Sequence, residues 1–188
     1  MNIFYLHDNP VTAAQMQCNV HVVKMILESA QMLSTAHRII DGEMYIDQTK
    51  QGRSIKRWFL PDDRENTLYK AAHVNHPCSV WVRQNSANYM WLYNHFIALC
   101  DEYTHRYGKV HRTDHLLREA LSAPPIHIVE SMIMTEPALA MPETCKLAGD
   151  AVQCYREYYE TKQSQFNMSW TNRQVPNWFH FYDEEYIL

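Results

Sequence analysis

The hydrophobic positions of this chain predict helices along most of its length. Between residues 10 and 39, apolar side chains cover more than half of a helical wheel, as in a largely buried helix. Asn9 and Pro10 favour a helix start there, because asparagine caps helices and proline suits their first turn. A second apolar face runs over residues 87–107 and ends at Gly108, a residue type that commonly stops a helix.

The other predicted elements are shorter. Residues 2–6 have strand character, and the runs 44–47 and 54–60 flank a turn, which predicts a β-hairpin. Further helices are expected from Pro77, from Thr113 to about 122, and from Asp150 to about 166. We therefore expect a mainly α-helical single domain over residues 1–188, a helical bundle with a hairpin insertion at about 43–60 and an aromatic tail at 168–188 that packs back.

Composition removes several classes of function. Four glycines in 188 residues leave no glycine-rich phosphate loop, and a net charge of −4 argues against non-specific coating of nucleic acid. Five cysteines without a CxxC pair predict reduced thiols. The chain has no membrane-length apolar run and no signal-peptide character, so we expect a cytoplasmic location and no membrane partner. No metal motif frames the histidines, and we expect no metal and no cofactor.

A narrow polar stripe follows the helix predicted over 10–39. It consists of Gln17, His21, Lys24, Glu28, Gln31, Thr35 and Arg38. Within it, Glu28 is placed four residues after Lys24, which predicts an ion pair between them. The stripe faces either solvent or a polar cleft, and the sequence leaves both interpretations open.

The helix predicted over 87–107 carries a similar polar row beside its core face. Such a row is typical either of a cleft wall or of boundary residues with satisfied hydrogen bonds. We expect Lys24, Glu28, Asn88 and Arg106 to meet in one polar cleft roofed by Trp81 or Trp91. The candidates divide by chemistry into proton-transfer residues (His21, Glu28, Glu102), phosphate-binding cations (Lys24, Arg83, Arg106, Lys109), base-stacking aromatics (Trp81, Tyr89, Trp91) and further polar cleft residues (Asn88, His95).

Four blocks of sequence resemble a helical protein family of tailed bacteriophages. They read AAQMQCNVHVVKMILESAQMLSTAHR, HPCSVWVRQNSANYMWL, DEYTHRYGKVH and YREYYETK…W…R…PNWF. More loosely, the blocks are similar to the phage group that hypermodifies thymine, which contains the α-glutamyl/putrescinyl-thymine pyrophosphorylases and the amino acid:DNA transferases. That resemblance implies transfer of an amine to an activated 5-hydroxymethyl pyrimidine in DNA, with release of pyrophosphate. It also implies a distant likeness to helical DNA glycosylases.

Three functional hypotheses follow. The first is a phage enzyme that hypermodifies DNA pyrimidines, a transferase with DNA and a small amine or amino acid as partners. The second is an accessory protein without enzymatic activity that binds a host protein or a nucleotide. The third is a DNA glycosylase-like enzyme that processes bases. The enzyme hypotheses gain support if the polar rows of the two long helices face each other in one pocket, and they lose support if both rows face bulk solvent.

Overall fold

The computed structural model describes residues 1–146 and 150–182, and α-helices make up most of its regular structure. The helices are α1 (Pro10–Gln15), α2 (Asn19–Asp41), α3 (Arg64–Thr67), α4 (Pro77–Val82), α5 (Ser86–Tyr107), α6 (Arg112–Leu117) and α7 (Ala151–Glu160), with the 3-10 helices η1 (Glu143–Cys145) and η2 (Thr161–Ser164). The antiparallel strands β1 (Glu43–Gln48) and β2 (Ser54–Phe59) form a hairpin in which Glu43 pairs with Phe59. The prediction of a mainly helical fold with a small hairpin is confirmed.

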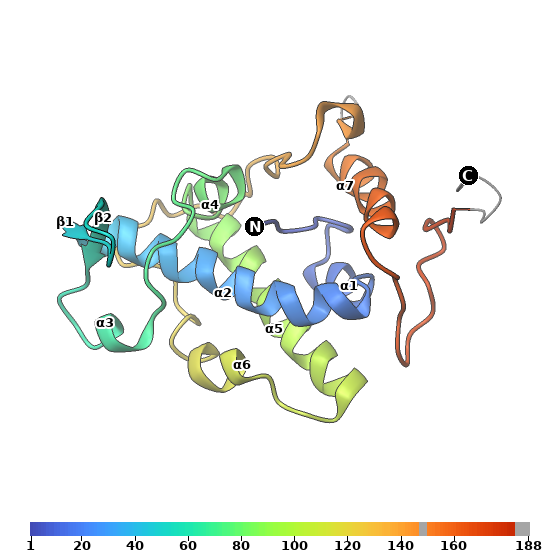
Figure 1. The fold of residues 1–188 in the computed structure, drawn as a ribbon, viewed down its shortest axis with the longest axis horizontal. Coiled ribbons are helices and arrows are strands. Elements are labelled where there is room, and N and C mark those ends of the chain that lie inside the picture. The colour runs from blue at the N-terminus through green and yellow to red at the C-terminus, as the bar shows by residue number, and fades with distance from the viewer. Residues whose placement is uncertain (147–149, 183–188) are drawn as a thin grey trace.

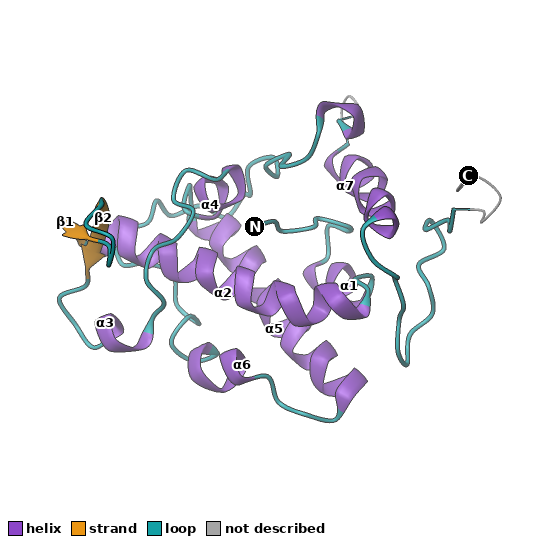
Figure 2. Cartoon of the chain, in the orientation of Figure 1, coloured by secondary structure: helices purple, strands orange, loops and turns teal. Residues whose placement is uncertain are grey.

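Helices α2 and α5 form the centre of the molecule. In Figure 1 they cross there, with the hairpin at one end of α2 and α1 at the other. Figure 2 shows that long loops join these helices to the C-terminal segment. The core contains apolar residues from α2, α5 and α7, among them Met25, Leu33, Phe96, Leu99 and Tyr155. Helix α2 is therefore buried on one side, as its wide apolar arc predicts.

The helix predicted over 10–39 is two helices, because the chain turns between Gln15 and Asn19. Asn9 caps α1 as expected. Two amides at the start of α2 find acceptors far along the chain: the Cys18 amide donates to the Tyr159 hydroxyl, and the Asn19 amide donates to the Ser169 carbonyl. These contacts with the C-terminal segment satisfy amides that a continuous helix would bond internally. The sequence around residues 15–19 contains no signal that predicts these distant contacts.

The predicted strand at residues 2–6 is wrong. The Asn2 side chain accepts hydrogen bonds from the Ile3 and Phe4 amides, a local pattern that competes with strand pairing. Phe4 then adopts φ 41°, which turns the chain sharply. The segment runs through the core as irregular structure, and Ile3 and Leu6 are fully buried.

Several helix boundaries differ from the predicted ones by a few residues. Asn85 caps α5, and His111 caps α6 in place of Thr113. Gly108 ends α5 with φ 64°, as expected. Asp150 caps α7, whose α-helical part ends at Glu160 before η2 continues it.

The C-terminal segment packs back on the helices, as predicted for the part that the structure describes. The Trp170 indole N–H donates to the Met16 carbonyl, and Trp170 and Phe179 are both buried. Residues 183–188 of the predicted tail lie outside the described residues. Within the described ranges, no helix has the length and apolar character that crossing a membrane requires.

Candidate active site

Glu28 lies against the first two residues of the chain. One oxygen of its carboxylate, Oε2, accepts a hydrogen bond from the Asn2 amide at 3.0 Å and is 3.5 Å from the α-amine of Met1. The other oxygen, Oε1, is 3.5 Å from the Lys24 ammonium, which confirms the predicted pair between these residues. The carboxylate is thus placed between two amines.

Asn2 holds this end of the chain in position. Its side-chain oxygen accepts from the Ile3 and Phe4 amides, and its side-chain nitrogen donates to the Ala140 carbonyl at 2.9 Å. The Met1 side chain is 2% exposed, and its sulfur accepts a hydrogen bond from Ser79. The α-amine is therefore attached to a well-anchored segment.

His76 borders the same group of charges. Its pKa is lowered, first by burial, then by the positive charges of the Met1 α-amine and His73, while Glu28 acts in the opposite direction. Lys24 differs from its neighbours because its side chain is 61% exposed, against 14% for Glu28. The site thus has a buried wall and a side that opens to solvent at Lys24.

Most of the polar stripe predicted over residues 10–39 is buried and bonded within the protein. Gln17 contacts His95, His21 contacts the Tyr159 hydroxyl, and Arg38 donates to main-chain carbonyls of the 58–68 region. The pKa of His21 falls to about 3, mainly through burial, and then through the charges of Lys24 and Lys162. His21 is therefore a buried core residue bonded to Tyr159, and this position corrects the expectation that it transfers protons in a cleft.

The three aromatic residues expected to stack on a base are core residues. Trp81 and Trp91 lie edge to face at 6.0 Å, and their indole N–H groups donate to the carbonyls of Thr135 and Asp8. Tyr89 is fully buried and bonds to His37. Because these rings pack on protein, they offer no base-stacking surface in this structure.

The polar residues of the first half of α5 are also satisfied internally. The Asn88 side chain donates to the Trp81 carbonyl and to Thr135, and accepts from the Thr135 amide. His95 lies between Gln17 and the Pro10 carbonyl, and burial lowers its pKa to about 4. Both residues are boundary residues with complete hydrogen bonding, the alternative that the sequence left open.

Glu102 and Arg106 form a buried pair at the other end of α5. Arg106 donates to Glu102 at 2.7 Å, to Asn19 and to the Gln15 carbonyl, and Arg173 contacts Glu102 from the C-terminal segment. Burial raises the pKa of Glu102, but the hydrogen bonds from Arg173 and Arg106 outweigh it, so the pKa is lowered overall. Glu102 is thus a fixed carboxylate that anchors two arginines, and the structure does not support proton transfer by it.

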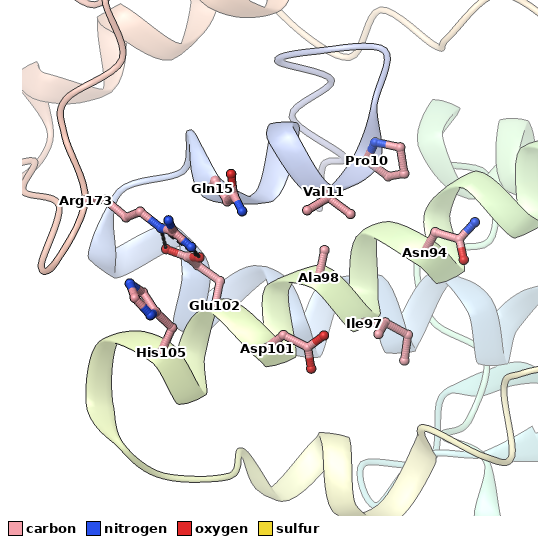
Figure 3. Close-up of a pocket in the computed structure, with 10 residues that line it drawn as sticks. All are labelled: Pro10, Val11, Gln15, Asn94, Ile97, Ala98, Asp101, Glu102, His105 and Arg173. Atoms are coloured by element: carbon pink, nitrogen blue, oxygen red, sulfur yellow. Dashed lines mark hydrogen bonds and ion pairs between the residues drawn. The ribbon is translucent and has the colours of Figure 1, made fainter.

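A cavity of about 490 Å³ adjoins this pair, between α1 and α5 (Figure 3). Arg173 and Glu102 close one end of it, and Asn94 and Ile97 lie toward the other. Arg173 and Glu102 pair with each other, and Asp101 pairs with Arg118 outside the cavity, which leaves no free cation aimed into it among the residues drawn.

The remaining predicted cations have different positions. Arg83 donates to the Val74 and Ser79 carbonyls and so holds the loop that leads to His76. Lys109 is exposed just beyond the end of α5.

The predicted cleft does not form, because its four members lie in three places. Lys24 and Glu28 lie on α2 beside the first residues of the chain. Asn88 is at the beginning of α5, and Arg106 is at the end of the same helix. Eighteen residues of helix separate Asn88 from Arg106, which corresponds to ~27 Å. Within the described residues, no group of three histidine, cysteine or acidic side chains is arranged to hold a metal ion.

Comparison with known proteins bears on the segment that forms the Met1–Glu28 site. The model of the family described as pyrimidine dimer DNA glycosylase matches residues 1–116. The chain belongs to this family. No curated protein and no solved structure gives a significant match.

Membership of the pyrimidine dimer DNA glycosylase family places this chain among proteins that process pyrimidines in DNA. It favours the glycosylase hypothesis over amine transfer, and nothing in the match concerns phages, pyrophosphate or hypermodified thymine. The matched segment contains α1 to α5 and the hairpin, whereas α7 and the C-terminal segment follow it.

Sequence reasoning selected Glu28 and Lys24 of this candidate site but did not select Met1 and Asn2. The amine of a first residue has no side-chain signature, and Asn2 falls in a run whose apolar residues suggest a strand. The narrow polar stripe on an otherwise apolar helix was the available signal, and it pointed to Glu28.

Proposed function

We propose that this protein is a DNA glycosylase that breaks the bond between a damaged pyrimidine and its deoxyribose, with an amine beside Glu28 as the nucleophile. The observation that carries the proposal is the Glu28 carboxylate placed between two amines, in the segment matched by the family. Amines and carboxylates are the groups expected of covalent glycosyl chemistry.

The chemistry needs few groups. The nitrogen lone pair attacks C1′ of the deoxyribose, and the bond from C1′ to the pyrimidine nitrogen breaks, with its electron pair leaving on the base. Glu28 accepts the proton that the attacking nitrogen loses, and its negative charge stabilises the positive charge that develops at C1′. The departing base takes up a proton from solvent. The C1′–O4′ bond of the sugar then breaks, O4′ takes the proton that Glu28 accepted, and the protein nitrogen is left joined to C1′ as an imine. Water hydrolyses this imine to the free amine and an aldehyde at C1′.

The Met1 α-amine is the favoured nucleophile. Alkyl ammonium groups of lysine hold their protons more tightly than α-amines do as a class, and Lys24 extends into solvent. Removal of Met1 would leave the Asn2 nitrogen, 3.0 Å from the same carboxylate oxygen, as the terminal amine. Either form keeps an amine beside Glu28.

The surface near Glu28 suits a damaged base. Val20, Val23 and Leu27 are exposed on α2 around Lys24, although large apolar residues are usually buried. Apolar side chains can contact the methyl groups of thymine, and Lys24 can face a phosphate. The exposed face of α2 therefore supports binding of DNA beside the amine.

The direct test is reduction of the imine. A duplex oligonucleotide with one cyclobutane thymine dimer is mixed with the protein and sodium borohydride, and the undamaged duplex serves as the control. We expect a covalent protein–DNA product with the damaged duplex only, and mass spectrometry of its peptides should find the DNA on the first residue. DNA on Lys24 would move the nucleophile to that side chain. Absence of both trapping and cleavage of the glycosyl bond would overturn the proposal.

The carboxylate has its own matched variant. Glu28→Gln keeps the shape and the hydrogen bond from Asn2 but cannot accept a proton, so we expect turnover to fall by about a hundredfold or more. Binding of the damaged duplex should change little, which a fluorescence anisotropy titration measures. Unchanged turnover in Glu28→Gln would exclude this carboxylate from the reaction.

A further inference from the structure

The β1–β2 hairpin concentrates positive charge on an acidic protein. Residues 49–58 contain Lys50, Arg53, Lys56 and Arg57 and no carboxylate, whereas the whole chain has a net charge of −4. The first three of these side chains are exposed. Arg57 lies 3.8 Å from Asp47, but its buried Nε–H has no hydrogen-bond acceptor among the described residues. The turn and β2 thus present cations that the protein itself leaves mostly unneutralised.

The middle of the opposite strand, between Glu43 and Asp47, is apolar and exposed. Met44, Tyr45 and Ile46 on β1 are each more than two-fifths exposed, and Met44 and Ile46 lie on the same face as Lys56 and Trp58. A two-stranded ribbon with an apolar edge and a basic edge matches the groove of duplex DNA, where apolar side chains contact bases and cations contact phosphates.

The hairpin is held firmly on the end of α2. Gly42 joins the two elements, and a Cβ at this position would lie 2.4 Å from the Arg38 carbonyl oxygen and 3.0 Å from that of Phe59. The buried Arg38 side chain also donates to the Trp58 carbonyl at 2.9 Å. This attachment fixes the ribbon relative to the helix that carries Glu28.

The hairpin and Glu28 share one side of α2. Thr35 follows Glu28 by two helical turns, or ~10.5 Å, on the same helix face, and its hydroxyl accepts a hydrogen bond from the Ala72 amide. The loop 71–75 therefore lies on that face, and a cavity of about 520 Å³ separates it from residues 55–58 of β2. The same loop leads to His76, whose pKa is lowered by burial and by the Met1 α-amine and raised by Glu28.

We propose that the β1–β2 hairpin binds duplex DNA beside the lesion, with Lys50, Arg53 and Lys56 on phosphates and Met44 and Ile46 against the groove. The ribbon begins about 20 Å from Glu28 along α2, the distance of thirteen helical residues, and DNA of six base pairs spans that length. The position of the hairpin beside a lesion rests on the proposed function, but binding of the hairpin to duplex DNA does not depend on any reaction.

The experiment measures binding to an undamaged duplex by fluorescence anisotropy across a series of salt concentrations. In the full chain, the triple variant Lys50→Ala, Arg53→Ala, Lys56→Ala should bind at least ~tenfold more weakly at low salt. Its slope of log affinity against log salt should become shallower by about 2–3, since each phosphate contact contributes ~0.9.

Arg112 supplies a matched control. It is exposed like Arg53, but it follows the end of α5, where Tyr107 contacts Asn19 at the start of α2, the end farther from the hairpin. Arg53→Ala should weaken binding and reduce the salt slope, and Arg112→Ala should do neither.

Wild-type affinity and slope in the triple variant would overturn the proposal, as would equal effects of Arg53→Ala and Arg112→Ala. A hairpin that binds another protein would give the first of these results. Because the duplex carries no lesion, loss of the proposed glycosylase activity and loss of the hairpin contact are measured separately. Thermal melting of each variant checks that the exposed substitutions leave the fold unchanged.

Discussion

At the scale of single residues, the Asn2 side chain fixes the position of the first residues of the chain. Its side chain makes three hydrogen bonds, two with amides of Ile3 and Phe4 and one with the Ala140 carbonyl. Asparagine suits this position because its amide can accept and donate at the same time. Glu28 alone would attract an amine, but Asn2 limits the positions that the Met1 amine can take.

Substitution of Asn2 is expected to affect catalysis more than folding. In Asn2→Ala the terminal segment loses its side-chain contacts, so borohydride trapping of a thymine-dimer duplex should slow by about tenfold or more. Asn2→Ser can still accept from a nearby amide and should give an intermediate rate. Equal trapping rates for the two variants and the wild type, measured at saturating duplex, would assign Asn2 no positioning role.

At the scale of elements, the end of α5 is fixed by a buried carboxylate with two arginines. The Arg106 side chain is fully buried and connects α5 to the start of α2 and to the Gln15 carbonyl. Buried ion pairs contribute little over an apolar pair, but removal of one partner leaves an uncompensated charge. Arg106 is therefore a structural residue, although the sequence pointed to phosphate binding.

Arg106→Ala should destabilise the fold rather than remove a ligand. We expect a loss of ~3–5 kcal/mol in the free energy of unfolding, because Glu102 keeps only Arg173. Arg173 is about one-third exposed, so Arg173→Ala should cost ~1 kcal/mol or less. Urea denaturation at neutral pH measures both. A wild-type stability in Arg106→Ala, with loss of DNA binding, would restore the phosphate-binding interpretation.

At the scale of the whole molecule, buried histidines make the fold sensitive to acid. Burial is the largest cause that lowers the pKa values of His21, His37 and His95, to about 3, 4 and 4. The unfolded chain binds protons at these residues near pH 6.5, whereas the folded chain does so only at pH 4 or below. Unfolding therefore takes up protons between these values, and stability falls as the pH falls through this window.

The expected acid sensitivity is large. Each of the three histidines adds up to ~1.4 kcal/mol per pH unit within the window, so stability near pH 5 should change by ~3–4 kcal/mol per unit. Urea denaturation at a series of pH values from 7.5 to 5 measures the slope. His95→Gln should reduce the slope by ~1.4 kcal/mol per pH unit, which is the contribution of one proton. A slope that His95→Gln does not alter would mean that this histidine is protonated in the folded chain.

The sequence predicted what depends on neighbours along the chain. The hairpin, the Asn9 cap, the Gly108 stop and the Lys24–Glu28 pair all follow from spacings of a few residues, and all are present. The split between α1 and α2 depends on Tyr159 and Ser169, more than a hundred residues away. Periodicity contains no information about such contacts.

The candidate site divides in the same way. The sequence pattern indicated Glu28 because this residue lies in a polar stripe. However, most residues of the stripe and of the polar row on α5 form hydrogen bonds inside the protein and do not face each other across a cleft. Helix length alone already placed Asn88 and Arg106 ~27 Å apart, too far for one small cleft. Chemistry carried by the main chain, such as the Met1 amine, becomes visible only when the fold brings it to a side chain.

The Tyr159 hydroxyl gives the boundary of the family match a different meaning. It lies outside residues 1–116, yet it accepts the Cys18 amide at the start of α2 and bonds to His21 one turn later. The family match and the hydrogen-bonded unit that contains it therefore end at different points along this chain. The matched segment depends on a hydrogen-bond acceptor, the Tyr159 hydroxyl, that lies after residue 116. A chimera that joins this segment to the C-terminal part of a relative therefore needs an equivalent hydroxyl at that place.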